Sequence, residues 1–416
     1  MVLTTRTDYT QLFMPDAVHR RVYTDPAIFD AEMQCIFGRT WVFVGHESEV
    51  PNPGDYKTDR IARQPITMTR HTDGQVYVLF NVCRHRGATV CQLPEGNATQ
   101  LRCIYHGWTY RNNGQLMSVP HVGRFGDDFH PRDYGLLPLP RVDSYRGFVF
   151  ASLSADGPDL HEHLGRANHY IDVMVDRAPA GAIQATKPLR YQYDGNWKLQ
   201  NENYADNYHP AILHQSTFEV GREIMVQKYR DRPAQARGDQ FDRSFGYGHG
   251  VTEYHNVRQW YDAFDDPEYL AALAARHGTD EAQRIAETDI HVMIYPNLLL
   301  HSRMNHYRVI KPLTVDRTEI QSFPCKLVGA PDRMNAIIIA YAAQHCSAGG
   351  EVQVDDLKAF AAVQEGLQVE AFEWVLFKLR GEHEHLNADG EWEGTGMSEL
   401  IQRGQYREWA RLMAEE

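Results

Sequence analysis

Hydrophobic and polar positions follow two different periods in the first part of this chain. After Thr24-Asp25-Pro26, apolar residues recur at helical spacing, which predicts a helix with proline in its first turn. From Trp41 onward apolar and polar residues alternate instead, and the turn dipeptides Asp73-Gly74 and Asn113-Gly114 predict hairpins between strands. The change of period predicts that a short helical segment precedes an all-β domain.

The same pattern indicates where the β domain ends and which elements come after it. The polar stretch 154–158 comes after the last strand, and a domain boundary is expected there. Residues 288–325 alternate as antiparallel strands do, whereas apolar residues in 353–379 recur at helical intervals. An amphipathic helix is expected at the C-terminal end. We therefore predict an N-terminal part of the second domain over residues 1–38, an inserted β domain over 39–155, and an α+β domain over 156–416.

Composition and charge exclude several classes of protein. The 416 residues are 43% hydrophobic and 23% charged, which is typical of a folded chain of about two to three domains. Lys plus Arg number 42 and Asp plus Glu number 55, so the net charge of −13 lacks the basic footprint that nucleic acid or an anionic membrane requires. There are six cysteines, no N-terminal signal pattern and no apolar stretch of about 18 residues, which predicts a cytoplasmic protein without disulfides or membrane spans.

Two short boxes in the β domain pair one cysteine with one histidine. Cys83-Arg-His85 is followed after 17 residues by Cys103-Ile-Tyr-His106, and each box lies where a strand gives way to a glycine-containing turn. Two thiolates and two imidazoles could hold a tetrahedral zinc ion, although zinc sites usually open with a closely spaced cysteine pair. A Rieske [2Fe–2S] cluster, in which one iron takes both cysteines and the other both histidines, requires this alternation. We therefore favour the cluster over structural zinc.

The residues around these boxes carry a family resemblance. Cys83-Arg-His85-Arg-Gly87 and Cys103-Ile-Tyr-His106-Gly107-Trp108 resemble the two cluster boxes in the large (alpha) subunits of Rieske non-haem iron aromatic ring-hydroxylating oxygenases. The resemblance implies Cys83 and Cys103 as ligands of one iron, and His85 and His106 as ligands of the other. Cys91 has no partner cysteine in the second box, which favours the oxygenases over respiratory Rieske proteins. Cys91 and the remaining cysteines are interpreted as ordinary buried thiols.

A second group of candidate ligands lies in the larger domain. Glu202, Asp206, His209 and His214 fall within thirteen residues. On a regular helix the two histidines would lie about 140° apart, so they converge only if the helix breaks between them. Pro210 disfavours helical geometry at His209 and so provides a reason for a break. Two histidines and one carboxylate on one face of an iron leave positions open for oxygen and substrate.

This segment resembles the catalytic-domain motif of the same oxygenases, in which a later helix supplies the acid. The resemblance implies His209, His214 and Asp356 as ligands of a mononuclear Fe(II), with Asp355 as the fallback, although an N-cap role would also explain this Asp pair. It gives Asp206 a catalytic position between His209 and His106 of a neighbouring subunit. It also implies an α+β fold, with an all-β Rieske [2Fe–2S] domain inserted in a helix-grip (START-like) catalytic domain that has an antiparallel sheet.

The resemblance implies a terminal oxygenase that receives electrons from a reductase, with or without a ferredoxin, so that NAD(P)H acts only through that partner. We expect it to hydroxylate or dihydroxylate an aromatic substrate with O2, and the length and C-terminal pattern favour an aromatic carboxylate. A homotrimer, or a trimer with an added β subunit, is expected. The alternatives are a monooxygenase of a quaternary ammonium, methyl-ether or N-methyl compound, a pure electron carrier, and a zinc-stabilised interaction protein.

The sequence does not determine which residues line the substrate pocket. An aromatic acid needs a cationic or hydrogen-bond-donating wall. Candidates for that wall include Arg222, Lys228, Arg230 and Arg303, while Tyr204, Tyr247 and Trp260 suit either a pocket or the core. The segment Glu382-His383-Glu384-His385 has metal-ligand residue types, but its polar surroundings predict a solvated loop.

Overall fold

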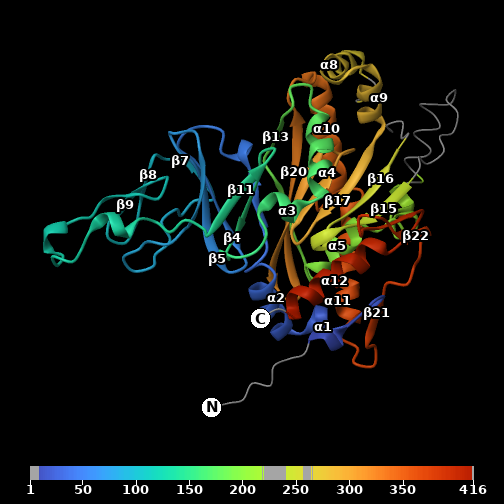
Figure 1. The fold of residues 1–416 in the computed structure, drawn as a ribbon, viewed down its shortest axis with the longest axis horizontal. Coiled ribbons are helices and arrows are strands. Elements are labelled where there is room, and N and C mark those ends of the chain that lie inside the picture. The colour runs from blue at the N-terminus through green and yellow to red at the C-terminus, as the bar shows by residue number, and fades with distance from the viewer. Residues whose placement is uncertain (1–8, 218, 220–239, 256–263, 265, 415–416) are drawn as a thin grey trace. The chain divides into compact units, whose positions relative to one another are not determined.

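The chain divides into two compact units in the computed structural model (Figure 1). The smaller unit is Met33–Leu160, and the larger unit is Met1–Glu32 together with His161–Glu416. The structure describes residues 9–217, 219, 240–255, 264 and 266–414. Within these ranges, no helix has both the length and the apolar character needed to cross a membrane.

The smaller unit is built from antiparallel sheets with short connections. One sheet has the order β6-β5-β4-β7, a second β10-β9-β8, and a third β11-β12-β3. The strands are β3 (Val42–His46), β4 (Asp55–Ile61), β5 (Gln64–Arg70), β6 (Val76–Phe80), β7 (Glu95–Asn97), β8 (Gln100–Arg102), β9 (Thr109–Arg111), β10 (Leu116–Ser118), β11 (Arg141–Tyr145) and β12 (Phe148–Ser152). The two predicted hairpins are confirmed, since β5 pairs with β6 and β9 pairs with β10.

The larger unit contains one long antiparallel sheet. Among the described residues it has the order β13-β20-β19-β18-β17-β16-β15-β23-β22, and β14 also pairs with β20. These strands are β13 (Ile183–Ala185), β14 (Leu189–Tyr193), β15 (Gln240–Ser244), β16 (Gly250–Tyr254), β17 (Asp289–Ile294), β18 (Leu298–His301), β19 (His306–Thr314), β20 (Arg317–Leu327), β22 (Glu382–Leu386) and β23 (Trp392–Thr395). The predicted antiparallel strands over 288–325 are therefore confirmed. A separate small sheet joins β1 (Phe13–Met14), β2 (Ala17–His19) and β21 (Trp374–Leu376).

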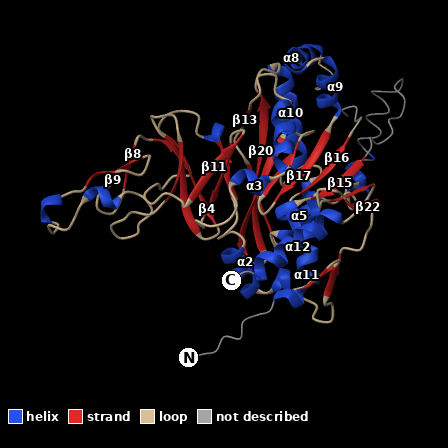
Figure 2. Ribbon diagram, in the orientation of Figure 1, coloured by secondary structure: helices blue, strands red, loops and turns tan. Residues whose placement is uncertain are grey.

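Helices cover this sheet, as the blue and red elements of Figure 2 show. The helices among the described residues are α1 (Arg21–Thr24), α2 (Pro26–Cys35), α3 (Leu160–Leu164), α4 (Ala167–Asp176), α5 (Lys198–Tyr204), α6 (Pro210–Leu213), α8 (Pro267–His277), α9 (Thr279–Glu287), α10 (Asp332–Cys346), α11 (Gln353–Gly366) and α12 (Leu400–Ala414). Of these, α4, α5, α10, α11 and α12 contact the long sheet. On β16, Thr252 contacts Asn207 after α5, whereas Glu253 contacts Tyr170 of α4. Because successive side chains of a strand point to opposite faces, α4 and the segment around Asn207 lie on opposite faces of the sheet.

Two predicted elements differ from the structure. The helix expected across 353–379 ends at Gly366, and residues 374–376 form strand β21 instead. The segment Glu382–His385, expected to be a loop, belongs to strand β22, although both of its histidines are exposed. Strand β21 depends on pairing with the distant strand β2, whereas β22 pairs with β23, which follows it directly along the chain. The predicted C-terminal helix is confirmed as α12.

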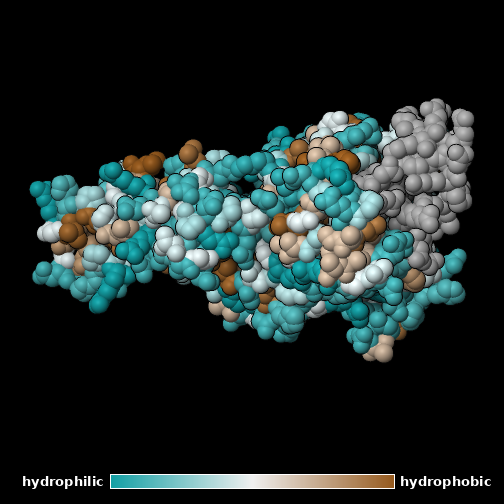
Figure 3. Space-filling model, turned by 90° about the horizontal axis from the view of Figure 1, so that it is seen from above, coloured by the Kyte–Doolittle hydropathy of each residue, from teal (hydrophilic) through white to brown (hydrophobic). Residues whose placement is uncertain are grey.

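Hydrophilic residues cover most of the face shown in Figure 3, and hydrophobic residues are scattered over it. In the smaller unit, the buried core includes Leu79, Leu101 and Trp108 and extends to Cys83 and Cys103. Both box cysteines therefore belong to the packed core of the smaller unit.

Candidate metal centres

The two Cys-His boxes form loops with the same backbone geometry. In each loop the cysteine N–H donates to the carbonyl oxygen five residues later, and the glycine N–H four residues after the cysteine donates back. These bonds are Cys83 N to Ala88 O at 2.8 Å, Gly87 N to Cys83 O at 3.0 Å, Cys103 N to Trp108 O at 2.8 Å and Gly107 N to Cys103 O at 3.1 Å. Gly87 and Gly107 have φ of 75° and 70°, in the left-handed region that favours glycine. This shared turn explains why glycine follows each box.

The side chains of the two loops converge with the cysteines inside and the histidines outside. Cys83 and Cys103 are buried in the core of the smaller unit. His85 and His106 are half-buried, and their Nδ1 atoms lie 3.1 Å apart. The ring of His85 stacks on Trp108, with 5.0 Å between ring centroids. Two sulfur and two imidazole donors thus meet from two loops, which fits a [2Fe–2S] cluster whose histidine-bound iron lies nearer to solvent.

Tyr110 is a residue of this site that the sequence did not single out. Its hydroxyl accepts a hydrogen bond from the Arg84 N–H at 3.1 Å and lies 3.2 Å from Cys83 Sγ, so its own proton can be donated to the sulfur. Burial, together with Cys83, raises the pKa of Tyr110, so the phenol stays protonated. In the alternation of β9 this tyrosine looks like a core residue, and only the folded loops bring its hydroxyl to the sulfur.

In the larger unit, His209 and His214 flank a helix of only four residues. α6 has His209 as its N-cap and His214 as its C-cap. His209 has helical backbone angles, φ −67° and ψ −33°, so the prediction that Pro210 disfavours helical geometry there is wrong. Pro210 occupies the first helical position, where its missing N–H is not needed. The chain leaves the helix at His214 instead, with φ −101° and ψ 23°, and the two imidazole rings come within 5.3 Å between centroids.

The structure brings the three predicted ligands of the mononuclear site together. His209 Nε2 lies 3.7 Å and His214 Nε2 lies 3.3 Å from the same Oδ1 atom of Asp356. One ligand atom from each residue lies within 4.8 Å of the other two. Asp356 is in the first turn of α11 and is buried, as is His214. Two imidazole nitrogens and one carboxylate oxygen thus face a common point, which is the donor set of the two-histidine, one-carboxylate iron sites.

Two further carboxylates contact the Nδ1 atoms of His209 and His214, the ring nitrogens that do not face Asp356. Asp206 Oδ2 lies 3.1 Å from His209 Nδ1, and Asp355 Oδ2 lies 3.3 Å from His214 Nδ1. A carboxylate at Nδ1 accepts the proton there and leaves Nε2 available to a metal. Burial lowers the pKa of His214, but Asp356 and Asp355 outweigh burial and raise it. The two neighbouring aspartates therefore have different contacts: Asp356 faces both Nε2 atoms, and Asp355 orients His214 through Nδ1.

Asn203 belongs to the motif in the sequence, but no role was assigned to it from the sequence. Its Nδ2 atom lies 3.0 Å from Asp356 Oδ1 and 3.2 Å from His209 Nε2, between two of the donors. The residue stands in the motif beside Glu202, but an amide is an uncommon metal ligand and gave no reason to select it. The fold of α5 places the Asn203 amide next to the Asp356 carboxylate.

A buried carboxylate, Glu32, fixes the start of α5. It is fully buried and accepts hydrogen bonds from Lys198 Nζ at 2.6 Å, from Trp197 Nε1 at 2.9 Å and from Trp409 Nε1 at 2.7 Å. These contacts join α2, α5 and α12. Because a buried charge is costly unless it is paired and hydrogen-bonded, the set holds α5 in one position beneath the donors.

Glu202 in the same helix is held by two phenols. Its Oε1 atom accepts a hydrogen bond from the Tyr23 hydroxyl at 2.9 Å and one from the Tyr406 hydroxyl. Burial raises the pKa of Glu202 to about 7. Glu202 is not among the three residues whose ligand atoms meet, so its contacts make it part of the support of α5.

A second Asp-His group in the larger unit also has the spacing of a metal site. Ligand atoms of Asp289, His291 and His301 lie within 4.8 Å of one another. However, Arg303 Nε lies 3.2 Å from Asp289 Oδ2, and the other oxygen accepts from Ser302 Oγ and Arg303 N, both at 3.0 Å. Burial raises the pKa of Asp289, but the Arg303 charge and His291 hold it well below its usual value. The positive charge of Arg303 disfavours a metal ion at this group, because its guanidinium already pairs with Asp289. Arg303, one of the candidates for the wall of the substrate pocket, is thus in an ion pair.

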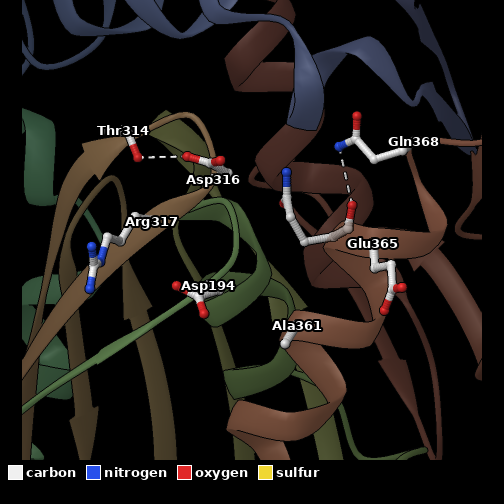
Figure 4. Close-up of a pocket in the computed structure, with 8 residues that line it drawn as sticks. Asp194, Thr314, Asp316, Arg317, Ala361, Glu365 and Gln368 are labelled. Atoms are coloured by element: carbon white, nitrogen blue, oxygen red, sulfur yellow. Dashed lines mark hydrogen bonds between the residues drawn. The ribbon is translucent and has the colours of Figure 1, made fainter.

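The other candidates from the sequence lie elsewhere. Arg222, Lys228, Arg230 and Trp260 are outside the described residues. The Tyr247 hydroxyl donates to Glu162 Oε1 at 3.3 Å. Of the cysteines interpreted as buried thiols, Cys91, Cys325 and Cys346 are buried, whereas Cys35 is half-buried. No predicted ligand lines the cavity of about 600 Å³ in Figure 4, which opens between the β19–β20 turn and α11 beside Asp194, Arg317 and Glu365.

Comparison with known families matches two domains of this chain. Residues 40–145 match the Rieske [2Fe-2S] domain, and residues 180–415 match the catalytic domain of the ring-hydroxylating alpha subunit. The chain therefore belongs to the ring-hydroxylating Rieske oxygenases, as an alpha subunit. It carries a Rieske [2Fe–2S] domain and a catalytic domain of the type that binds a mononuclear iron, and it is an oxidoreductase. The expected fold class is confirmed.

Individual relatives give the same assignment. The chain is 35% identical to the alpha subunit of toluate 1,2-dioxygenase from Pseudomonas putida, over 83% of this chain and 78% of that protein. It is 33% identical to the large subunit of 2-halobenzoate 1,2-dioxygenase from Burkholderia cepacia, over 85% and 78%. A solved structure of naphthalene 1,2-dioxygenase with indole bound superposes with a TM-score of 0.87 at 24% identity, over 98% of this chain and 95% of that one, which shows the shared fold.

Proposed function

We propose that this chain is the alpha subunit of a terminal oxygenase that hydroxylates an aromatic carboxylate with O2. The observation that carries the proposal is the convergence of His209, His214 and Asp356 on one point. A protein that only relays electrons needs no such donor set. The similarity to relatives named for toluate and 2-halobenzoate supports the substrate class.

The residues divide between two metal groups. We assign Cys83 and Cys103 to one iron of the [2Fe–2S] cluster, and His85 and His106 to the other. We assign His209, His214 and Asp356 to a mononuclear Fe(II), which, when bound, supplies reductive oxygen activation with electrons from the cluster. Asp206 and Asp355 accept the Nδ1 protons of the two imidazoles and keep Nε2 of each toward the metal.

We infer a trimer, with or without a β subunit, in which His106 of one subunit meets Asp206 and His209 of the next. Large hydrophobic side chains flank both histidines and would be covered in such an interface. These are Ile104 and Tyr105, 72% and 58% exposed, and Tyr208 and Ile212, 60% and 77% exposed. Covering apolar surface contributes about 25 cal/mol per Å². In this arrangement Asp206 holds or accepts a proton between the two imidazoles. A reductase, with or without a ferredoxin, supplies the electrons.

Metal analysis tests the two sites. Anaerobically purified wild type should contain about three irons and two acid-labile sulfides per chain. The His209→Ala variant should lose about one iron and keep the visible spectrum of the cluster. About two irons in both proteins would leave only an electron carrier, and zinc in a colourless protein would remove the Rieske assignment.

Turnover tests the substrate class. With a reductase and ¹⁸O2, we expect benzoate and toluates to stimulate oxygen consumption and to give hydroxylated products. Mass spectrometry would show whether one or two oxygen atoms are inserted. Products from neutral arenes or N-methyl compounds, with none from aromatic acids, would overturn the carboxylate assignment but not the enzyme class.

A further inference from the structure

A buried arginine in the larger unit has no acidic partner among the described residues. Arg308 lies on β19 and is 7% exposed. Its Nε donates to His306 Nε2 at 3.1 Å, and its guanidinium carbon lies 5.5 Å from the centre of the Tyr204 ring. The groups that act on its charge most strongly are Tyr191, Cys346 and Tyr204, none of which is a carboxylate. A buried charge without a counter-ion is costly, so an anion bound next to Arg308 would stabilise this part of the fold.

The neighbours of Arg308 do not compensate its charge. Burial and the adjacent guanidinium hold the pKa of His306 well below its usual value, so this imidazole is neutral. Burial raises the pKa of the Cys346 thiol, although Arg308 opposes that shift. The local groups are therefore an uncharged ring, a thiol and two phenols around one positive charge.

Other buried arginines of the same unit show what a structural arginine looks like here. Arg177 is fully buried, and its Nη1 donates to the carbonyl oxygens of Ile285 at 3.2 Å and Thr288 at 3.0 Å. Arg403 is 6% exposed, and its Nη2 lies 2.6 Å from Glu384 Oε2. Arg308 has neither backbone carbonyl acceptors nor a carboxylate among the described residues, and a nitrogen and a sulfur are its only hydrogen-bonding partners there.

Buried hydroxyls without hydrogen-bond partners lie around Arg308. Ser322 is directly opposite Arg308 in the β19–β20 register, and its Oγ atom has no partner. The hydroxyls of Tyr191 and Tyr204 are also buried and without partners. Tyr191 pairs with Ile320, which pairs with Ile310, two residues from Arg308, so Tyr191 and Arg308 lie on the same face of the sheet. A ligand with several acceptor lone pairs would satisfy all of these donors.

This group adjoins the donors of the mononuclear site. Tyr204 directly follows Asn203, whose amide lies 3.0 Å from Asp356 Oδ1. The charge of Asp356 also acts on Tyr191 and on Cys346, which are the groups beside Arg308. A ligand bound at Arg308 therefore lies next to the Asp356 end of the catalytic site.

We propose that Arg308, with the hydroxyls of Ser322, Tyr191 and Tyr204, binds the carboxylate of the substrate and selects aromatic acids over neutral arenes. The inference rests on the proposed function and specifies how its substrate is recognised. The guanidinium can present two parallel N–H donors to a carboxylate, which adds orientation as well as charge. Arg308 is then a specificity-determining residue, and the aromatic ring of the substrate is held near Asp356.

Binding to the anaerobic holoenzyme, without turnover, tests this assignment. Isothermal titration would compare benzoate with benzamide, a neutral analogue of similar shape. Arg308→Gln should weaken benzoate binding at least about tenfold, because it removes one partner of a buried charge pair, and should change benzamide binding less than about twofold. Arg308→Lys, which keeps the charge but loses the fork, should give an intermediate ratio. Ser322→Ala should reduce benzoate affinity a few-fold.

Arg177→Gln is the matched control, since it also removes a buried guanidinium from the same unit. It should lower the melting temperature without changing the ratio of benzoate to benzamide affinity. An unchanged ratio in folded Arg308→Gln would overturn the assignment while wild-type turnover of benzoate leaves the proposed function intact. If Arg308→Gln does not fold, an unchanged ratio in Arg308→Lys has the same meaning. Wild type that binds no aromatic acid would overturn both proposals.

Discussion

The two candidate metal centres are built in opposite ways. In the smaller unit, two copies of one loop, with the same hydrogen bonds and a left-handed glycine in each, supply all four donors. In the larger unit, His209 and His214 flank a single-turn helix, and Asp356 comes from α11, far along the chain. The first centre depends on local backbone geometry, whereas the second depends on how α5 and α11 pack. A repeated turn can be recognised from spacing, and a site assembled by packing cannot.

The residues that contact the candidate ligands also differ between the two centres: they are local in the smaller unit and come from several helices in the larger one. The Rieske loops place Tyr110 at Cys83, within the same small core. The candidate donors of the mononuclear site contact carboxylates and Asn203, and the buried contacts of Glu32 and Glu202 position α5. Changes in the larger unit should therefore act through metal affinity and stability, and changes in the smaller unit through the cluster itself.

Removal of a cluster cysteine should produce the largest effect and tests whether the two centres are independent. Cys83→Ser should lose about two irons and both labile sulfides per chain, with the visible spectrum, because a hydroxyl replaces a thiolate ligand. Turnover should fall below about 1% of wild type, while the mononuclear iron stays. Iron analysis and absorption spectra measure this. Cys325→Ser, a buried thiol of the larger unit, is the control, and loss of all iron in Cys83→Ser would contradict independence.

Substitution of Asp355 and substitution of Asp356 should reduce iron affinity to different extents. Asp356→Asn should lose the mononuclear iron, because its Oδ1 atom faces both Nε2 atoms. Asp355→Asn should weaken iron binding about 10- to 100-fold, because it only orients His214. Competition with a chelator measures both affinities, and the exposed His385→Ala should match wild type. Equal losses in the two aspartate variants would show that Asp355 is itself a ligand.

Glu202 should make the stability of the larger unit depend on pH. Its pKa of about 7 is above the ordinary 4.5, so the folded state binds this proton more tightly than the unfolded chain does. The wild type therefore loses stability as pH rises from about 4.5 through 7, on the order of 3 kcal/mol in total. Glu202→Gln keeps the acceptor for both tyrosines but cannot ionise. Urea unfolding should show this variant to be more stable than wild type at pH 8.5, with little difference at pH 4.5.

Glu268→Gln, at an exposed position, is the comparison for that measurement and should follow the wild-type curve, because it keeps Glu202. If Glu202→Gln follows the wild-type curve at every pH, the carboxylate is not what makes the unit sensitive to pH. The support of α5 would then have to be attributed to the Glu32 contacts alone.

The smallest expected effect concerns the hydroxyl at the cluster. Tyr110→Phe removes a hydrogen bond to Cys83 Sγ that stabilises the more negative, reduced cluster. The reduction potential should fall on the order of 40 mV, which corresponds to about 1 kcal/mol for one electron. Redox titration followed by absorbance measures this shift. Tyr77→Phe, whose hydroxyl contacts the surface residue Asp73, should leave the potential unchanged, and a potential that rises in Tyr110→Phe would contradict the assigned direction of the hydrogen bond.

The sequence by itself determined what depends on neighbouring residues. The spacing of the two boxes predicted the donor set of the cluster, and alternation predicted the hairpins and the strands over 288–325. Local rules also misled: Pro210, the first residue of α6, did not prevent helical geometry at His209, and the helix expected beyond Gly366 gives way to strand β21. Pro210 fits the first helical position of α6, and at β21 pairing with the distant strand β2 outweighs local propensity.

Only the tertiary structure decided which side chains meet across long separations. It divided the roles of Asp355 and Asp356, placed Asn203 between the donors and paired Arg303 with Asp289. It also left Arg308 buried without an acid among the described residues. A strand pattern tells which residues share a face, but burial and charge pairing depend on what the opposing helices bring to that face. The candidate cluster ligands could therefore be proposed from local spacing and Asp356 from the family resemblance, whereas the recognition of the substrate depends on packing.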